Sequence, residues 1–205
     1  MKKIFLLAII LVVISCKYES QSEANFVSYH KGGEAFAEID NDGNNNYSKA
    51  LELFKKSIEE HPNHIESYQM KMLCEFHLGQ LDNALETSIK VISNKKNHKH
   101  HYIADFYITA GIVEKINGEN EKSLEYLQEA LNVFEKRIRR NKKDIYAIIN
   151  KPLVLCYMNK KDDAIEFLNS QSVDEQHQSI LESAQEELLI FDTDEFIKNL
   201  GNKKF

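Results

Sequence analysis

The sequence predicts an all-α protein made of repeated antiparallel helical hairpins, and three observations support this. Only seven glycines and two prolines occur among the 205 residues, so regular structure has few breaks. Apolar residues recur every three or four positions along almost the whole chain, which is the spacing of one helix face. One segment also recurs three times in degenerate form. We therefore expect consecutive helices of similar pattern that pack against one another.

The most regular helix is predicted within residues 47–63, YSKALELFKKSIEEHPN. Ala50 and Ser57 are small enough to let a neighbouring backbone approach, and Pro62 ends the helix because it has no N–H group to donate. The large apolar residues share one face: Tyr47, Leu51, Phe54 and Ile58. Small and large positions together predict a helix that packs against two others.

The motif Ala50-Leu51-Glu52 recurs in related form at residues 84–86, 123–125 and 164–166. Sixteen residues before each of these copies, an upstream helix is marked by Tyr68, Tyr107 and Ile148. The turns between the paired helices are predicted at residues 79–80, 117–118 and 159–160. The first copy has a turn five residues longer. The four copies therefore predict four hairpins, spaced by 34, 39 and 41 residues.

On these residues, the segment 24–172 resembles the tetratricopeptide repeat (TPR) family, whose unit is a 34-residue helical hairpin. The first repeat matches the family pattern at Gly33, Ala50, Phe54, Ser57 and Pro62. The third repeat matches it at Tyr107, Gly111, Gly118, Leu127 and Ala130. The resemblance implies a short solenoid of about four antiparallel hairpins.

Three positions depart from the pattern of this family. Met72 and Pro152 replace the small residue of the first helix, and Ser88 replaces the large residue of the second helix. Because a proline interrupts the hydrogen bonds of a helix, we expect a kink or a new helix start near Asn150.

Residues 173–205 are predicted to cap the last repeat. Ser179–Ile190 reads as an amphipathic helix, with Ile180, Leu181, Ala184, Leu188 and Leu189 on its apolar face. Thr193 is predicted to N-cap a last helix that reaches Leu200 and ends at Gly201. A solenoid needs such a cover over its terminal apolar flank. The alternative is an eroded fifth repeat whose second helix is residues 193–200.

The N-terminal residues 1–15 read as a secretory signal, because Lys2 and Lys3 precede an apolar run too short to cross a bilayer. Val13-Ile14-Ser15-Cys16 resembles a bacterial lipobox. The resemblance implies cleavage before Cys16, diacylglycerol on its thiol, and an acyl chain such as palmitate on the new N-terminus. Residues 16–23 then form a lipidated tether. Lys17 favours the outer membrane, and the alternative is an ordinary cleaved signal.

The net charge argues against one class of partner, and the cysteine positions indicate whether a disulfide bond is expected. The mature chain has 24 basic and 32 acidic residues, which argues against nucleic acid as a partner. Cys74 and Cys156 lie two repeats apart, so we expect two buried or half-buried free thiols and no disulfide bond between them.

The predicted binding site is a groove lined by the first helices of the repeats, which in this family holds peptides or partner helices. By position, the residues facing it are Gln69, Leu73, Ile108, Ile112, Ile149 and Leu153. A protein or peptide partner of unknown identity is therefore expected. The alternative is that these residues pack against neighbouring repeats or the cap.

Three polar stretches offer other chemistry. His98, His100 and His101 are dense enough for a metal site, which makes envelope metal binding the alternative function, although a loop without metal explains them as well. The stretch 40–46 alternates Asp and Asn as calcium loops do, but its glycine is misplaced and a turn is favoured. The basic stretch 135–143 suits a solvated helix end or an anionic partner. No catalytic or cofactor motif occurs, so we predict a binding protein without cofactor and not an enzyme.

Overall fold

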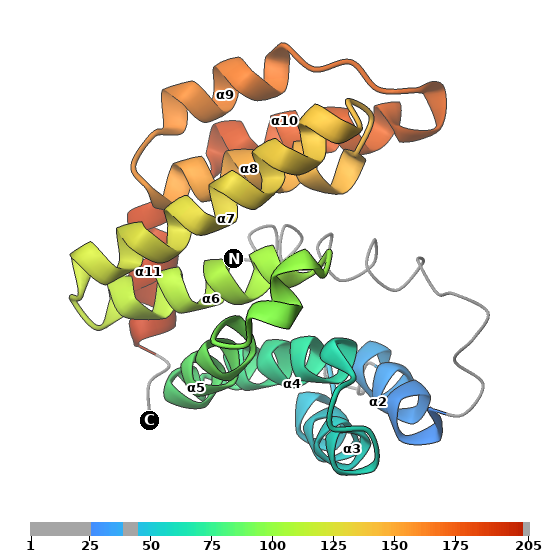
Figure 1. The fold of residues 1–205 in the computed structure, drawn as a ribbon. Coiled ribbons are helices and arrows are strands. Elements are labelled where there is room, and N and C mark those ends of the chain that lie inside the picture. The colour runs from blue at the N-terminus through green and yellow to red at the C-terminus, as the bar shows by residue number, and fades with distance from the viewer. Residues whose placement is uncertain (1–25, 39–44, 203–205) are drawn as a thin grey trace. The chain divides into compact units, whose positions relative to one another are not determined.

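The computed structural model describes residues 26–38 and 45–202, which form α-helices joined by turns and short 3-10 segments (Figure 1). The predicted signal segment, Cys16 and the tether lie outside the described residues, as do residues 40–44 of the predicted turn. No helix in the described ranges is both long and apolar enough to span a membrane. The described chain divides into two compact units, with boundaries inside α7 (Asn120–Arg140) and α11 (Thr193–Gly201).

The first unit, called the N-terminal unit, holds residues 26–38, 45–126 and 198–202. Its complete helices are α2 (Val27–Ala37), α3 (Tyr47–Glu60), α4 (Ile65–His77), α5 (Leu81–Ile92) and α6 (Ile103–Ile116), with the 3-10 segment η1 (Lys95–Lys99) before α6. Each of these helices packs against the next one along the chain, and α4 also contacts both α2 and α6. The helices predicted to come first in each hairpin therefore lie beside one another.

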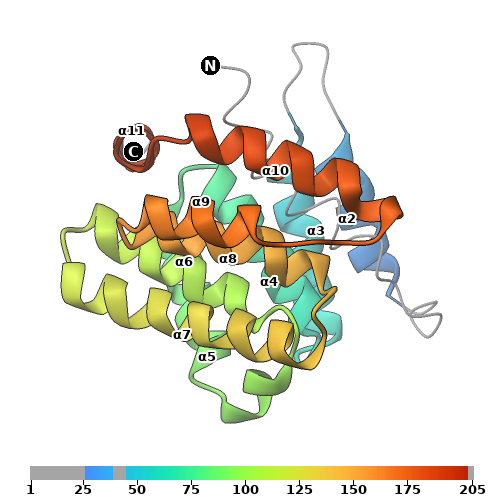
Figure 2. The same cartoon turned by 90° about the horizontal axis from the view of Figure 1, so that it is seen from above.

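The second unit, called the C-terminal unit, holds residues 127–197. It contains the second part of α7 (Asn120–Arg140), then α8 (Ile145–Tyr157), α9 (Lys161–Asn169), η2 (Glu175–His177), α10 (Gln178–Ile190) and the start of α11 (Thr193–Gly201). α8 packs against α9, and α10 contacts both of them (Figure 2). The all-α class, the hairpins and the C-terminal capping helix are therefore confirmed.

The three predicted turns adopt the same backbone conformation. Gly79, Gly118 and Asn159 have φ of 74°, 82° and 61°, in the left-handed region that closes many helices. In the first of them, Gly79 N–H donates to Phe76 O (3.1 Å) and Gln80 N–H donates to Glu75 O (2.8 Å). The other two turns repeat this pair of bonds. Each of these three hairpins thus turns back through the same hydrogen-bonded loop.

The first hairpin has its closest helix contact one residue away from the predicted position. A Cβ atom on Gly32 would lie 2.7 Å from Cε1 of Phe54, whereas a Cβ atom on Gly33 would meet nothing within 4 Å. Phe54 is completely buried where α2 packs on α3. The small residue that the packing requires is therefore Gly32, and the match at Gly33 is wrong by one position.

α8 continues through Pro152, so the predicted restart near Asn150 is wrong. The amide of Asn150 donates to Tyr146 O (2.8 Å) one turn earlier. Most of α8 is buried, including Pro152 itself, against α9 and α10. We attribute the continuity to this packing, which offsets the one N–H group that proline removes.

The cap differs from its prediction in two details. Leu181 and Leu188 are buried, but Leu189 is 63% exposed and does not belong to the packed face. The N-cap of α11 is Asp192, whose carboxylate accepts from Glu195 N–H (2.9 Å). Thr193 instead donates its hydroxyl to Cys156 O of α8 (3.2 Å), because it is already inside the helix.

Candidate protein-binding surface

The predicted groove residues on α4 and α6 meet through a hydrogen bond. Gln69 of α4 is buried, and its side-chain amide donates to the carboxylate of Asp105 on α6. Both residues lie on helices that come first in their hairpins. This bond joins the two hairpins by polar side chains on the face where the groove was predicted.

Leu73 and Ile108 lie one helical turn beyond Gln69 and Asp105 respectively, on the same faces of α4 and α6. Both side chains are half-buried, whereas Ile112, a further turn along α6, is only 4% exposed. In the N-terminal unit, the accessible part of the predicted groove is therefore the pair Leu73 and Ile108. We call this pair the α4/α6 surface.

The two predicted groove residues of the C-terminal unit are buried. Ile149 is 6% exposed and Leu153 is 7% exposed, both on α8. Of the six predicted residues, four are therefore buried, as the packing alternative expects. Their apolar character alone could not distinguish a binding face from a core face, because both use the same helical spacing.

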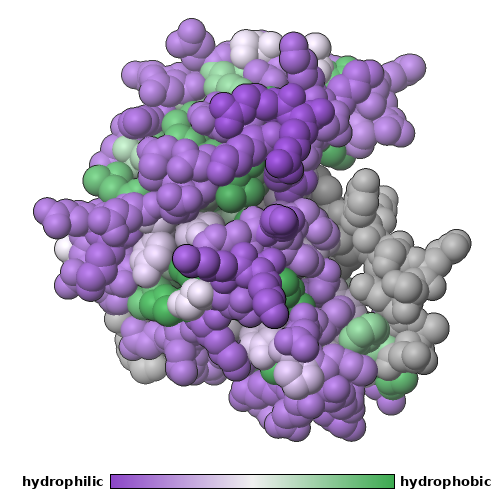
Figure 3. All heavy atoms as spheres, in the orientation of Figure 1, coloured by the Kyte–Doolittle hydropathy of each residue, from purple (hydrophilic) through white to green (hydrophobic). Residues whose placement is uncertain are grey.

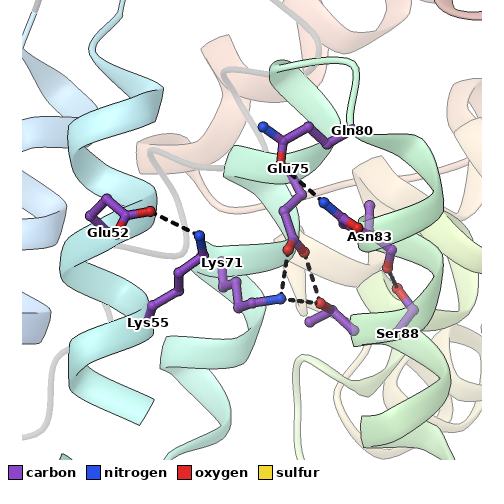
Figure 4. Close-up of polar contacts among 9 residues, drawn as sticks. Glu52, Lys55, Lys71, Glu75, Gln80, Asn83 and Ser88 are labelled. Carbon is purple, nitrogen blue, oxygen red and sulfur yellow. Dashed lines mark hydrogen bonds and ion pairs between the residues drawn. The ribbon is translucent and has the colours of Figure 1, made fainter. Parts of the chain in front are cut away.

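A buried ionic cluster between α4 and α5 was not predicted from sequence (Figure 4). Lys71 Nζ donates to Glu75 Oε1 (2.6 Å) and to Thr87 Oγ1 (2.6 Å), and Thr87 donates to Glu75 Oε2 (2.8 Å). Glu75 is 2% exposed. The i, i+4 spacing of Lys71 and Glu75 was a visible signal, but such pairs usually lie on solvated faces. The hydrogen bonds of this cluster join α4 to α5.

The histidines of the predicted metal cluster form other contacts. Nε2 of His98 lies 2.7 Å from Ile92 O, and Nε2 of His100 lies 3.0 Å from a carboxylate oxygen of Glu66. The rings of His100 and His101 stack, with centroids 5.0 Å apart. Across residues 26–38 and 45–202, no three His, Cys, Asp or Glu side chains are placed to hold a metal ion. The arrangement favours a structural role, which is to fix the loop between α5 and α6.

Glu66 lies between two imidazoles. Its carboxylate oxygens are 3.4 Å from Nε2 of His64 and 3.0 Å from Nε2 of His100. Burial raises the pKa of Glu66, but the hydrogen bond from His100, a backbone hydrogen bond and the charges of His100 and His64 together lower the pKa to about 2. The carboxylate is therefore ionised throughout the neutral range.

A serine beside His64 resembles the start of a nucleophilic site. Nδ1 of His64 is 2.7 Å from Oγ of Ser67, which in turn is 2.7 Å from Oγ of Ser57. Both serines are completely buried, so no substrate can reach either hydroxyl. This array joins the end of α3 to the start of α4 and is not a catalytic site.

The predicted free thiols are confirmed. Cys74 and Cys156 are unpaired and buried, on α4 and α8 respectively. Burial raises the pKa of both thiols, to about 11 for Cys156. Because the thiolate is the reactive form, neither cysteine is an activated nucleophile at neutral pH.

The face of the molecule shown in Figure 3 is mainly hydrophilic, with hydrophobic residues in small patches. Among the described residues, the large hydrophobic side chains with the greatest exposure are Val27, Ile89, Leu124, Leu189 and Ile190. They come from four different helices, α2, α5, α7 and α10.

Comparison with known proteins identifies the fold. No protein-family model matches the sequence, and no curated protein matches it either. Among solved structures, a thermophilic TPR protein from Thermus thermophilus aligns over 86% of this chain and 88% of its own, with a TM-score of 0.56 and 21% identity. MamA aligns over 78% of this chain and 89% of its own, with a TM-score of 0.39 and 18% identity. The first of these alignments shows that the chain has a TPR-type fold.

Proposed function

We propose that this protein is a membrane-anchored adaptor that binds a protein or peptide partner in the bacterial cell envelope. The observation that carries the binding part is the α4/α6 surface. Leu73 and Ile108 are two half-exposed apolar side chains on adjacent first helices, held together by the bond between Gln69 and Asp105. Apolar anchors on a rigid helical base suit a hydrophobic segment of a partner.

The anchoring part of the proposal depends on residues 1–16. The lipobox-like sequence before Cys16 supports acylation of its thiol, and several acyl chains hold a protein at a bilayer because each buried methylene contributes about 0.8 kcal/mol. The outer membrane is favoured, with the repeats facing the periplasm or the cell surface. To test the anchoring, the full chain is expressed in a bacterial host. Membrane association is then measured by fractionation, and acylation is measured from the intact mass of the protein. Cys16→Ala is expected to release the protein from membranes and to remove the acyl mass. Membrane retention without any added acyl mass would exclude lipid anchoring.

The binding part is tested with charged substitutions on the surface. Leu73→Asp and Ile108→Asp place a charge on each half-exposed anchor, so we expect partner affinity to fall at least about tenfold for each. Ile89→Asp is the matched control, because Ile89 is 37% exposed on the second helix α5. The assay is co-purification of the full-length protein from solubilised membranes, with helical content checked by circular dichroism. Equal recovery of the same partner by all three variants would exclude this surface.

A further inference from the structure

The end of α7 and the loop after it carry five exposed cations: Lys136, Arg139, Arg140, Lys142 and Lys143. We call this group the basic tip. In the part of the chain that the structure describes, none of the five forms an ion pair. The whole chain is acidic, with a formal net charge of −6, so the tip concentrates charge of the opposite sign.

The backbone of the basic tip is fixed by hydrogen bonds. Asn141 closes the turn after α7 by accepting from Lys143 N–H (3.0 Å) on its side chain and from Asp144 N–H (3.1 Å) on its carbonyl. Arg137 then donates to both carboxylate oxygens of Asp144, at 2.8 and 2.9 Å, and its guanidinium covers the ring of Tyr146. Because the backbone of the tip is already ordered, binding would cost little further backbone entropy.

The three cations of the tip that belong to α7 lie on the same face of that helix. Lys136, Arg139 and Arg140 stand at i, i+3 and i+4 and so share one face of α7. The two acidic residues that flank the tip in sequence are paired with other cations. Glu135 pairs with Lys151 (3.3 Å), and Asp144 is occupied by Arg137.

Favourable interaction with the helix dipole does not account for the whole group. Cations stabilise the last turn of a helix, and the effect falls off within that turn. Lys142 and Lys143 lie beyond α7, which ends at Arg140. A cluster that continues past the helix is better explained by an external polyanion.

We infer that the basic tip binds the anionic headgroup surface of a phospholipid bilayer. The choice of lipid over an acidic protein rests on the proposed membrane anchoring, which would keep the tip close to a bilayer. Each basic residue near an anionic membrane contributes about 1 kcal/mol, or about fivefold in binding. Salt weakens such binding, because the Debye length is only about 10 Å at 0.1 M.

The test measures sedimentation of the full-length chain with vesicles of phosphatidylcholine alone, or of equal parts phosphatidylcholine and phosphatidylglycerol. One variant changes all five cations of the tip to serine. The control variant changes five exposed lysines elsewhere to serine: Lys31, Lys95, Lys96, Lys99 and Lys198. Both variants lose the same charge, and residues 1–25 are identical in all three proteins, so those residues contribute equally.

We expect phosphatidylglycerol to strengthen binding of the wild type, and the tip variant to lose at least about a hundredfold of that gain. The control variant is expected to lose less than about tenfold, and high salt to abolish the difference between the variants. Equal losses in the two variants would overturn the inference. The inference would also be overturned if binding to polyglutamate depended on the tip and binding to vesicles did not. That result would assign the tip to an acidic protein. The test does not require acylation of Cys16, so its failure would leave the anchoring proposal standing.

Discussion

At the scale of single residues, the packing of the first hairpin depends on a missing side chain. Gly32 and Gly33 are adjacent on α2 and chemically identical, yet only Gly32 faces a ring. Phe54 is completely buried, so its ring has little room to move away. The two glycines therefore form a natural pair for comparison.

Gly32→Ala is expected to destabilise the protein by about 1–3 kcal/mol, because the added methyl group would overlap Phe54. Gly33→Ala is expected to stabilise it by about 0.5–1 kcal/mol, since alanine is the better helix former and meets no neighbour. Denaturant unfolding measures both changes. Adding Phe54→Leu to Gly32→Ala should recover part of the loss, and equal effects at the two glycines would contradict this packing.

The carboxylate of Glu66 makes stability depend on pH. Its folded pKa of about 2 lies below the ordinary value of 4.5, so its stabilising contribution is complete above pH 4.5 and is lost as the pH falls toward 2. The side chain is 21% exposed, and the contribution is at most about 3 kcal/mol. Glu66→Gln is therefore expected to lower the free energy of unfolding at pH 5–7. Unfolding measured at pH 5 and at pH 2 should show that difference shrinking, and a constant difference would refute the role of the carboxylate.

At the scale of elements, the three left-handed turns are equivalent positions with different residues. Gly79 and Gly118 adopt positive φ without a penalty, while Asn159 bears the cost of a side chain in that region. The turn at Asn159 thus has the same backbone conformation as the two glycine turns.

Asn159→Gly is expected to stabilise the α8–α9 hairpin by about 0.5–1 kcal/mol, and Gly118→Ala to destabilise its own hairpin by about 1–2 kcal/mol. The added Cβ at Gly118 would meet no atom within 4 Å, so its effect isolates the backbone conformation. Thermal unfolding of the two variants gives both values. A neutral result at Gly118 would mean that the positive φ is not required.

In the α4–α5 hairpin, the first helix has a large residue at the position where a small one is expected, and the second helix has a small residue where a large one is expected. Met72 stands where a small residue is expected, and Ser88 stands where a large one is expected. Both are completely buried, in helices that pack on one another. We therefore infer that the extra volume of Met72 compensates for the volume missing at Ser88.

This compensation predicts non-additive mutations. Met72→Ala is expected to cost about 2–4 kcal/mol through a cavity, and Ser88→Leu about 1–3 kcal/mol through overpacking. The double variant should cost less than the sum by about 1 kcal/mol or more, because each change relieves the other. A double-mutant cycle from denaturant unfolding measures this term, and strict additivity would show that the two sites do not share a space.

At the scale of the whole molecule, the hairpins and their turns could be predicted because they depend on local spacing. The periodicity around Ala50 and the glycines at the turns specify helices and reversals without knowledge of the rest of the fold. Long-range contacts could not be predicted in this way. The bond from Gln69 to Asp105 spans 36 residues, and the burial of Ile149 depends on its neighbours in space. Only Leu73 and Ile108, of the six residues predicted to line the groove, are therefore half-exposed, and the other four are buried.

Site-specific crosslinking in intact membranes tests whether the α4/α6 surface binds a partner. A photoreactive amino acid is placed in the full-length chain at position 73, 108 or 89 in turn. We predict adducts of one common mass from positions 73 and 108 and none from position 89, because Ile89 lies on the second helix α5. Adducts from position 89 alone, or from none of the three positions, would show that the α4/α6 surface does not bind a partner.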